Sequence, residues 1–244
     1  MGQIVQQDRA VSLELMHALC SLLDDEWEGV GSTKQRAQVA ALGAYSVIAF
    51  CGSFRGNEVF TVDLHGLIKY GKDRLIAAGK EYVMIPLLGR FKNEVGDQYH
   101  LTPLIATTRS GLNIRLWVNH LIEVRQAAQQ LRGPAFADAK SGRVHVDWFE
   151  RELLERFQSI QSRRPDLIPS DVQVLEEYGL SRSFRRGATS EARARGTGKE
   201  DIDLTNRWRT FEGAKGKRPR MAMRDHYSDI RLLIPALIRF LENL

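Results

Sequence analysis

Residues 82–105 read YVMIPLLGRFKNEVGDQYHLTPLI, two short apolar runs on either side of a polar, basic connection. Runs of this length that are rich in branched and aromatic residues and bounded by Gly, Asn and Asp are typical of paired strands. The pattern predicts strands near residues 82–88 and 99–105. Because most of the remaining chain has helical spacing, we expect a mainly α fold with a small β-hairpin or sheet, which is the α+β class.

The segments on both sides of this hairpin carry apolar residues at helical spacing. Before it, residues 11–23 predict a helix that Asp24 and Asp25 end, and Thr33 is the expected N-cap of a longer helix reaching about Phe50. After it, we expect helices over residues 112–131, 144–160, 183–195 and 230–244. Thr197 and Glu200 have the spacing of a capping box that starts one more. No repeat or linker interrupts the pattern, so we expect one domain over residues 1–244, with residues 1–32 as a helical lead-in.

Composition excludes several classes of protein. The 244 residues, 43% of them apolar and 27% charged, can build a sizeable core. No apolar run approaches the roughly 20 residues of a membrane-spanning helix, and the first ten residues do not resemble a secretory signal. Cys20 and Cys51 both lie in apolar surroundings, as in the core of a protein from a reducing compartment. We therefore expect an intracellular protein with no membrane partner.

The positive charge of the chain is concentrated near its C-terminal end. Residues 181–220 contain twelve Lys and Arg but only five Asp and Glu, whereas the whole chain has a net charge of +5. All of the basic excess therefore lies in this segment. Such a stripe is the electrostatic signature of a protein that binds a polyanion, most often nucleic acid. A solvated basic face without a partner is the alternative that charge alone leaves open.

The usual catalytic motifs do not occur. The sequence has no phosphate-binding glycine loop, no Gly-x-Ser-x-Gly and no His or Cys spacing that suits zinc. We expect no cofactor and no metal. What remains is a dispersed set of chemically capable residues: Arg55 with Glu58, Lys92 in the hairpin connection, Arg182 and Arg185 in RSFRRGAT, Trp208 in NRWR, and Tyr227 in RDHYSDI.

This series resembles the catalytic domain of the tyrosine recombinases, the phage-integrase class of DNA breaking-rejoining enzymes. The resemblance covers residues 33–244. In order along the chain, the family has a first arginine box, a hairpin lysine, a His-x-x-Arg box, a His or Trp, and a nucleophilic tyrosine. The matching positions are Arg55 with Glu58, Lys92, Arg182 with Arg185, Trp208 and Tyr227.

The resemblance implies a metal-independent transesterification. Tyr227 would attack the phosphorus, Arg55 and Arg185, with Arg182, would neutralise the phosphate oxygens, and Lys92 would protonate the leaving 5′-oxygen. Trp208 would hydrogen-bond the phosphate or support the tyrosine segment. The product would be a 3′-phosphotyrosyl intermediate and a free 5′-hydroxyl, ready for rejoining without ATP.

Two features depart from the family pattern. Arg182 stands where the family most often has histidine, and arginine cannot act as a general base because it stays charged. The interval from Trp208 to Tyr227 is also longer than usual and holds the basic segment GAKGKRP, residues 213–219. His226, next to Tyr227, is the residue that could supply the missing imidazole. These departures suggest a divergent, Crypton-like mobile-element branch of the family.

The resemblance also implies partners. We expect double-stranded DNA and self-association on it as a dimer or tetramer, in the nucleus or nucleoid according to the host. The helix over residues 230–244 docks either on its own core or on a neighbouring protomer. We expect no counterpart of the family's N-terminal core-binding domain within residues 1–32, which are too few for it, so the sequence is expected to be an isolated catalytic domain or a fragment. Two alternatives to a recombinase or integrase remain: a catalytically silent DNA-binding relative, and a type IB topoisomerase-like enzyme that relaxes DNA.

Overall fold

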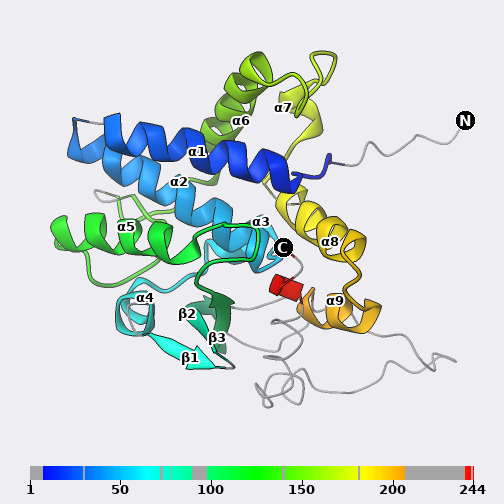
Figure 1. The fold of residues 1–244 in the computed structure, drawn as a ribbon. Coiled ribbons are helices and arrows are strands. Elements are labelled where there is room, and N and C mark those ends of the chain that lie inside the picture. Colours follow the sequence, from blue (N-terminus) through cyan, green and yellow to red (C-terminus); the bar gives the residue numbers. More distant parts are fainter. Residues whose placement is uncertain are drawn as a thin grey trace, which may run out of the picture.

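The fold is seen in a computed structural model that describes residues 8–29, 31–71, 74–77, 79–89, 98–138, 141–180, 182–206, 240–242 and 244. Over these residues the chain is mainly helical with one small antiparallel sheet, the expected α+β class (Figure 1). The helices are α1 (Leu13–Gly29), α2 (Thr33–Cys51), α3 (Gly56–Val59), α4 (Leu64–Tyr70), α5 (Ile114–Ala127), α6 (Val146–Arg163), α7 (Val174–Glu177), α8 (Ser183–Ala194) and α9 (Lys199–Thr205). None of these helices is long and apolar enough to cross a membrane.

Helix α2 is the centre of the packing. Every residue of α2 from Val39 to Cys51 is buried, and α1, α5 and α8 all pack against it (Figure 1). Its small residues allow this close approach: a Cβ added at Gly43 would lie 2.0 Å from the ring of Trp117 on α5. The helix starts as expected, but its N-cap is Ser32, whose Oγ accepts the amide of Gln35 at 3.3 Å, rather than Thr33.

The prediction that Asp24 and Asp25 end the first helix is wrong. Helix α1 continues for another turn to Gly29, because residues beyond the two aspartates have tertiary partners. The ring of Trp27 stacks on that of His120 at a centroid distance of 3.9 Å, and Glu26 pairs with Arg156 of α6 at 2.7 Å. Contacts with distant segments override the local preference of aspartate for a helix end.

The sheet has three strands in the order β1 (Leu75–Ala77), β2 (Lys80–Gly89) and β3 (Gln98–Ile105). The expected hairpin is confirmed, with Tyr82 opposite Ile105 and Gly89 opposite Gln98. β1, which pairs with β2, was not predicted, because three residues are too few to show a period. Helix α4 lies against β2, and Asp63 caps α4 by accepting the amide of Gly66 at 2.8 Å.

An aromatic cluster connects the helices that surround the candidate site. The fully buried ring of Tyr45 on α2 lies 5.0 Å from that of Phe60, 5.5 Å from Phe149 and 6.0 Å from Phe136 and Phe184. Rings at these distances interact favourably beyond their burial. Because Phe60 follows α3 and Phe184 precedes Arg185, the cluster fixes both segments that carry the predicted arginines.

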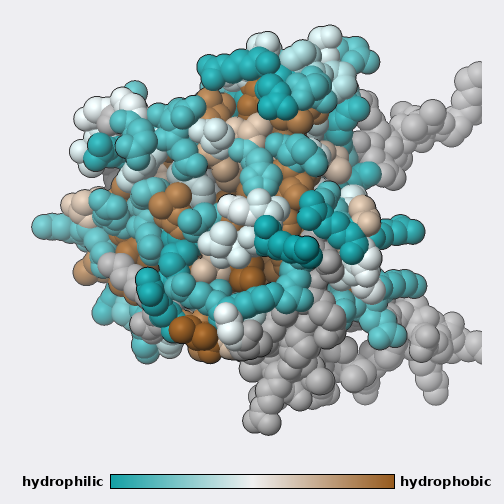
Figure 2. All heavy atoms as spheres, viewed as in Figure 1, coloured by the Kyte–Doolittle hydropathy of each residue, from teal (hydrophilic) through white to brown (hydrophobic). Residues whose placement is uncertain are grey.

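The surface is mostly polar, with apolar side chains in small separate groups on the face shown in Figure 2. At the C-terminal end, Phe240, Leu241 and Leu244 are buried in this chain's own fold, and Glu242 forms an ion pair with Lys80 at the start of β2. Residues 230–239 of the predicted terminal helix lie outside the described residues.

Candidate active site

Arg55 and Glu58 form the first part of the candidate site, at the turn after α2. The backbone amide of Arg55 donates to Glu58 Oε2 at 2.9 Å, and its guanidinium Nη1 donates to Glu58 Oε1 at 3.2 Å. A carboxylate three residues into a helix that binds the amide preceding the helix fixes the local backbone, as in a capping box. The Arg55 side chain remains 42% exposed, whereas that of Glu58 is only 11% exposed.

Arg185 comes to the same carboxylate from α8. Its Nη1 lies 3.8 Å from Glu58 Oε2, and the residue is 7% exposed. The structure therefore brings together Arg55 and Arg185, which the sequence places far apart. Two guanidinium groups against one carboxylate leave an excess of positive charge at this point. Such a site attracts an anion, and the planar guanidinium suits phosphate in particular.

Asn206, at the end of α9, holds the other side of Arg185. Its Oδ1 accepts Arg185 Nε at 2.8 Å, and its backbone carbonyl accepts Arg185 Nη2. The asparagine is fully buried, and its Nδ2 donates to the carbonyl of Ile202 at 2.9 Å. The guanidinium of Arg185 is thus held from two sides, by Glu58 and by Asn206.

Two hydroxyl groups complete the surroundings of Asn206. Ser53 Oγ donates to Asn206 Oδ1 at 2.8 Å, and Thr189, one turn after Arg185 on α8, exchanges hydrogen bonds with the same side-chain amide at 3.2 and 3.3 Å. Ser53 is buried and has a φ of 48°. A left-handed non-glycine residue is held only where its surroundings fix it, and such residues concentrate at functional sites.

Arg182 takes a different position from Arg185. It is the N-cap residue of α8 and is exposed, and it makes no ion pair with any residue that the structure describes. The contacts at this carboxylate therefore join Arg55, Glu58 and Arg185, and they do not include Arg182. Its place one turn before Arg185 keeps it near the same end of α8.

Lys92, Trp208 and Tyr227, together with His226, lie outside the described residues. In sequence, Lys92 belongs to the connection between the paired ends of β2 and β3, Gly89 and Gln98. Trp208 follows Asn206, the residue that binds Arg185, by two positions.

Sequence reasoning missed Ser53, Thr189 and Asn206. Serine, threonine and asparagine are common in turns and helix ends, and no spacing rule relates these three positions to one another. The only local sign is the Cys51-Gly52 break, which shows where the chain turns at Ser53. Their common role depends on α2, α8 and α9 meeting in space.

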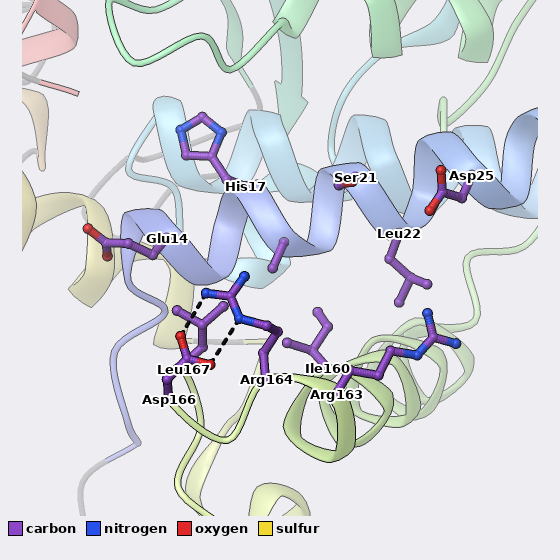
Figure 3. Close-up of a pocket in the computed structure, with 11 residues that line it drawn as sticks. Glu14, His17, Ser21, Leu22, Asp25, Ile160, Arg163, Arg164, Asp166 and Leu167 are labelled. Atoms are coloured by element: carbon purple, nitrogen blue, oxygen red, sulfur yellow. Dashed lines mark hydrogen bonds and ion pairs between the residues drawn. The ribbon is translucent and has the colours of Figure 1, made fainter.

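A metal centre has no support in the described ranges, where no group of three or more His, Cys, Asp or Glu side chains could hold an ion. A groove of about 640 Å³ lies elsewhere, between α1 and the end of α6 (Figure 3). It is lined by His17, Leu22, Ile160 and Arg163 among others, and Arg164 at its edge forms an ion pair with Asp166 at 2.7 Å. None of the residues predicted from sequence lines it.

No family model matches this chain, and no curated protein matches it either.

Proposed function

We propose that this protein is a site-specific DNA recombinase or integrase of the tyrosine recombinase type, with the catalytic-domain fold of that family. The observation that carries the proposal is the meeting of Arg55 and Arg185 at Glu58. The resemblance assigns Arg55, Arg185 and Arg182 to one phosphate, and the first two of these lie at the same carboxylate. The helices and the hairpin do not by themselves require these two arginines to meet. Their proximity is therefore an independent observation in favour of the proposal.

The burial of each arginine suits a different task. Arg55, with 42% of its side chain exposed, is the group that an incoming phosphate would meet first. Arg185 is held by Glu58 and Asn206, so its donors are fixed before substrate arrives. Donors that need no rearrangement stabilise the charge that develops in a transition state more effectively than mobile ones.

The reaction exchanges one phosphoester for another. The Tyr227 oxygen forms a bond to phosphorus while the bond from phosphorus to the 5′-oxygen breaks, and Lys92 gives the leaving 5′-oxygen its proton. The phenolic proton of Tyr227 leaves to a base, for which His226 is the adjacent candidate. Attack by the free 5′-hydroxyl of another strand on the phosphotyrosine reverses these steps and rejoins the DNA. Trp208 and Arg182 would contact the phosphate from the surrounding surface.

The basic segment supplies the affinity for DNA. Residues 181–220 contain twelve Lys and Arg, Arg182 and Arg185 among them. Contacts of lysine and arginine with phosphates provide most non-specific affinity for DNA. We place the protein with DNA inside the cell, self-associated as a dimer or tetramer on its target, and in a divergent mobile-element branch. A catalytically silent DNA-binding relative is the second candidate, favoured by the arginine at position 182, which cannot act as a general base.

A trapping experiment tests the proposal. The protein is incubated with duplex DNA that carries randomised sequence around one nick, so that cleavage near the nick releases a short fragment and prevents rejoining. We expect a covalent protein–DNA adduct that survives denaturing electrophoresis and maps to Tyr227 by mass spectrometry. Tyr227→Phe should form none. Tyr99→Phe, a change at an exposed tyrosine on β3, is the matched control and should form adduct normally.

Absence of the adduct, or an adduct at another residue, would contradict the proposal. If the wild-type protein binds the duplexes tightly but forms no adduct with any of them, the silent binding protein replaces the recombinase. An adduct that maps to a residue other than Tyr227 would overturn the assignment of the nucleophile.

A further inference from the structure

The least expected feature of the site is that Asn206 meets Arg185 with both its side chain and its backbone. The Nε and Nη2 atoms of Arg185 point to one residue, through Asn206 Oδ1 at 2.8 Å and through the Asn206 carbonyl. These two donors lie on one edge of the guanidinium. Binding that edge fixes both the position and the plane of the group, and turns Nη1 toward Glu58, 3.8 Å away.

The same asparagine amide is itself held in one orientation. Its Nδ2 donates to the Ile202 carbonyl at 2.9 Å and to Thr189 Oγ1 at 3.2 Å, while Ser53 Oγ donates to Oδ1 at 2.8 Å. With the amide reversed, Nδ2 would face the Nε–H donor of Arg185 and Oδ1 would face the carbonyl oxygen of Ile202, so these two fixed partners select the observed orientation. Burying polar groups is costly unless they are paired, and both polar atoms of the Asn206 side chain have partners here.

The network also joins three segments of the site. Ser53 precedes Arg55 by two residues, Thr189 lies on the helix of Arg185, and Asn206 precedes Trp208 by two residues. A shift of any one segment would change the hydrogen bonds of the other two. The left-handed backbone of buried Ser53 indicates that this arrangement is maintained against a local conformational cost.

We infer that Asn206, supported by Ser53 and Thr189, is the positioning residue that fixes the guanidinium of Arg185 for the scissile phosphate. This inference rests on the proposed function. It assigns to Asn206 no contact with DNA, and it states that the loss of its side chain acts through Arg185.

The test compares Asn206→Leu with Thr205→Val. Leucine has the same branching at Cγ as asparagine but no hydrogen-bonding groups. Thr205 is the adjacent buried residue, and its hydroxyl makes no hydrogen bond within the described part of the chain, so valine is a matched control for the disturbance of this helix end. Adduct formation is timed on nicked duplexes with a normal scissile phosphodiester and with an uncharged methylphosphonate in its place.

We expect Asn206→Leu to slow adduct formation on the phosphodiester by about 100-fold or more, the size of effect seen when one preorganised donor is lost. On the methylphosphonate, which lacks the charge that Arg185 neutralises, the loss should be at least about tenfold smaller. The affinity of Asn206→Leu for DNA should equal that of the wild-type protein. Thr205→Val should form adduct at the wild-type rate. An equal loss on both substrates, or no loss at all, overturns the inference, because a general folding defect would not distinguish the two phosphates.

A second measurement does not depend on activity. In the wild-type protein the Arg185 Nε–H should give a slowly exchanging NMR signal, assigned by its absence in Arg185→Lys, and Asn206→Leu should abolish its protection. Retained protection would overturn the positioning role even if no DNA were ever cleaved. If the signal behaves as expected but the wild-type protein forms no adduct, the positioning stands and the proposed function fails.

Discussion

The carboxylate of Glu58 lies 3.8 Å from the guanidinium of Arg185, and its other oxygen accepts a hydrogen bond from Arg55. One short helix, α3, therefore places a largely buried acid between cations from two distant parts of the chain. A buried carboxylate is tolerated only when paired. Glu58 thus links the stability of this region to the geometry of the two arginines.

Neutralising Glu58 should destabilise the protein. In Glu58→Gln the hydrogen bond to the Arg55 amide can persist, but both guanidinium groups lose their counter-charge, so we expect a loss of about 1–3 kcal/mol in the free energy of unfolding. Urea denaturation measures it. Glu155→Gln removes an exposed carboxylate that pairs with Arg151 at 3.8 Å, and should cost less than about 1 kcal/mol. Equal losses of unfolding free energy in the two variants would show that Glu58 contributes no more to stability than an exposed ion pair does.

Arg185→Ala should abolish adduct formation and leave DNA binding largely intact. Many other cations share the non-specific affinity, so the salt dependence of binding should change little. Arg182→Ala removes an exposed side chain and should change the free energy of unfolding by no more than about 0.5 kcal/mol, while lowering the slope of log K against log salt by about 1 if it contacts a phosphate. Fluorescence anisotropy over a series of salt concentrations separates these effects. Cleavage by Arg185→Ala at the wild-type rate would remove it from the site.

Gly187→Ala should disturb the packing of α8 against the segment before α1. A Cβ at this position would lie 1.7 Å from the carbonyl oxygen of Val11, and the amide of Val11 is in turn bound to the Ser183 carbonyl at 3.0 Å. Because the backbone itself must move, we expect a loss of about 1–3 kcal/mol or more. Gly31→Ala, where a Cβ meets nothing within 4 Å, is the control for thermal or urea unfolding. Unchanged stability in Gly187→Ala would mean that the segment before α1 does not hold α8.

The stability of the fold should fall in mild acid because of His120. Burial lowers the pKa of His120 from its usual 6.5, and the nearby Glu123 and Glu28 oppose this shift only in part. The unfolded chain therefore binds a proton more readily than the folded chain, so stability is highest above pH 6.5 and decreases as the pH falls through that value. Urea unfolding at pH 7.5 and 5.5 measures the difference.

His120→Phe, which keeps a ring against Trp27, should reduce this pH dependence. Substitution of His145, an exposed residue, by Gln is the control for removing a histidine. A His120→Phe protein with the same loss of stability in acid would assign the effect to other groups.

The hairpin and the long helices could be predicted because their signals are local. Residues 82–105 alternate and turn within one short stretch, and the helix over residues 183–195 is nearly the observed Ser183–Ala194. Short elements were missed because they carry no such local signal. α4 and β1 have too few residues for a period, and tertiary contacts define them.

The sequence by itself determined the α+β class, the order of the chemically capable residues and the concentration of positive charge in residues 181–220, because composition, period and order are properties of the chain alone. Only the tertiary structure decided that Arg55 and Arg185 share Glu58, that Arg182 is exposed, and that Ser53, Thr189 and Asn206 surround the second arginine. Those relationships depend on how α2, α3, α8 and α9 pack together. A side chain acquires a partner from a distant segment only when burial brings the two segments into contact, and no local pattern records that meeting.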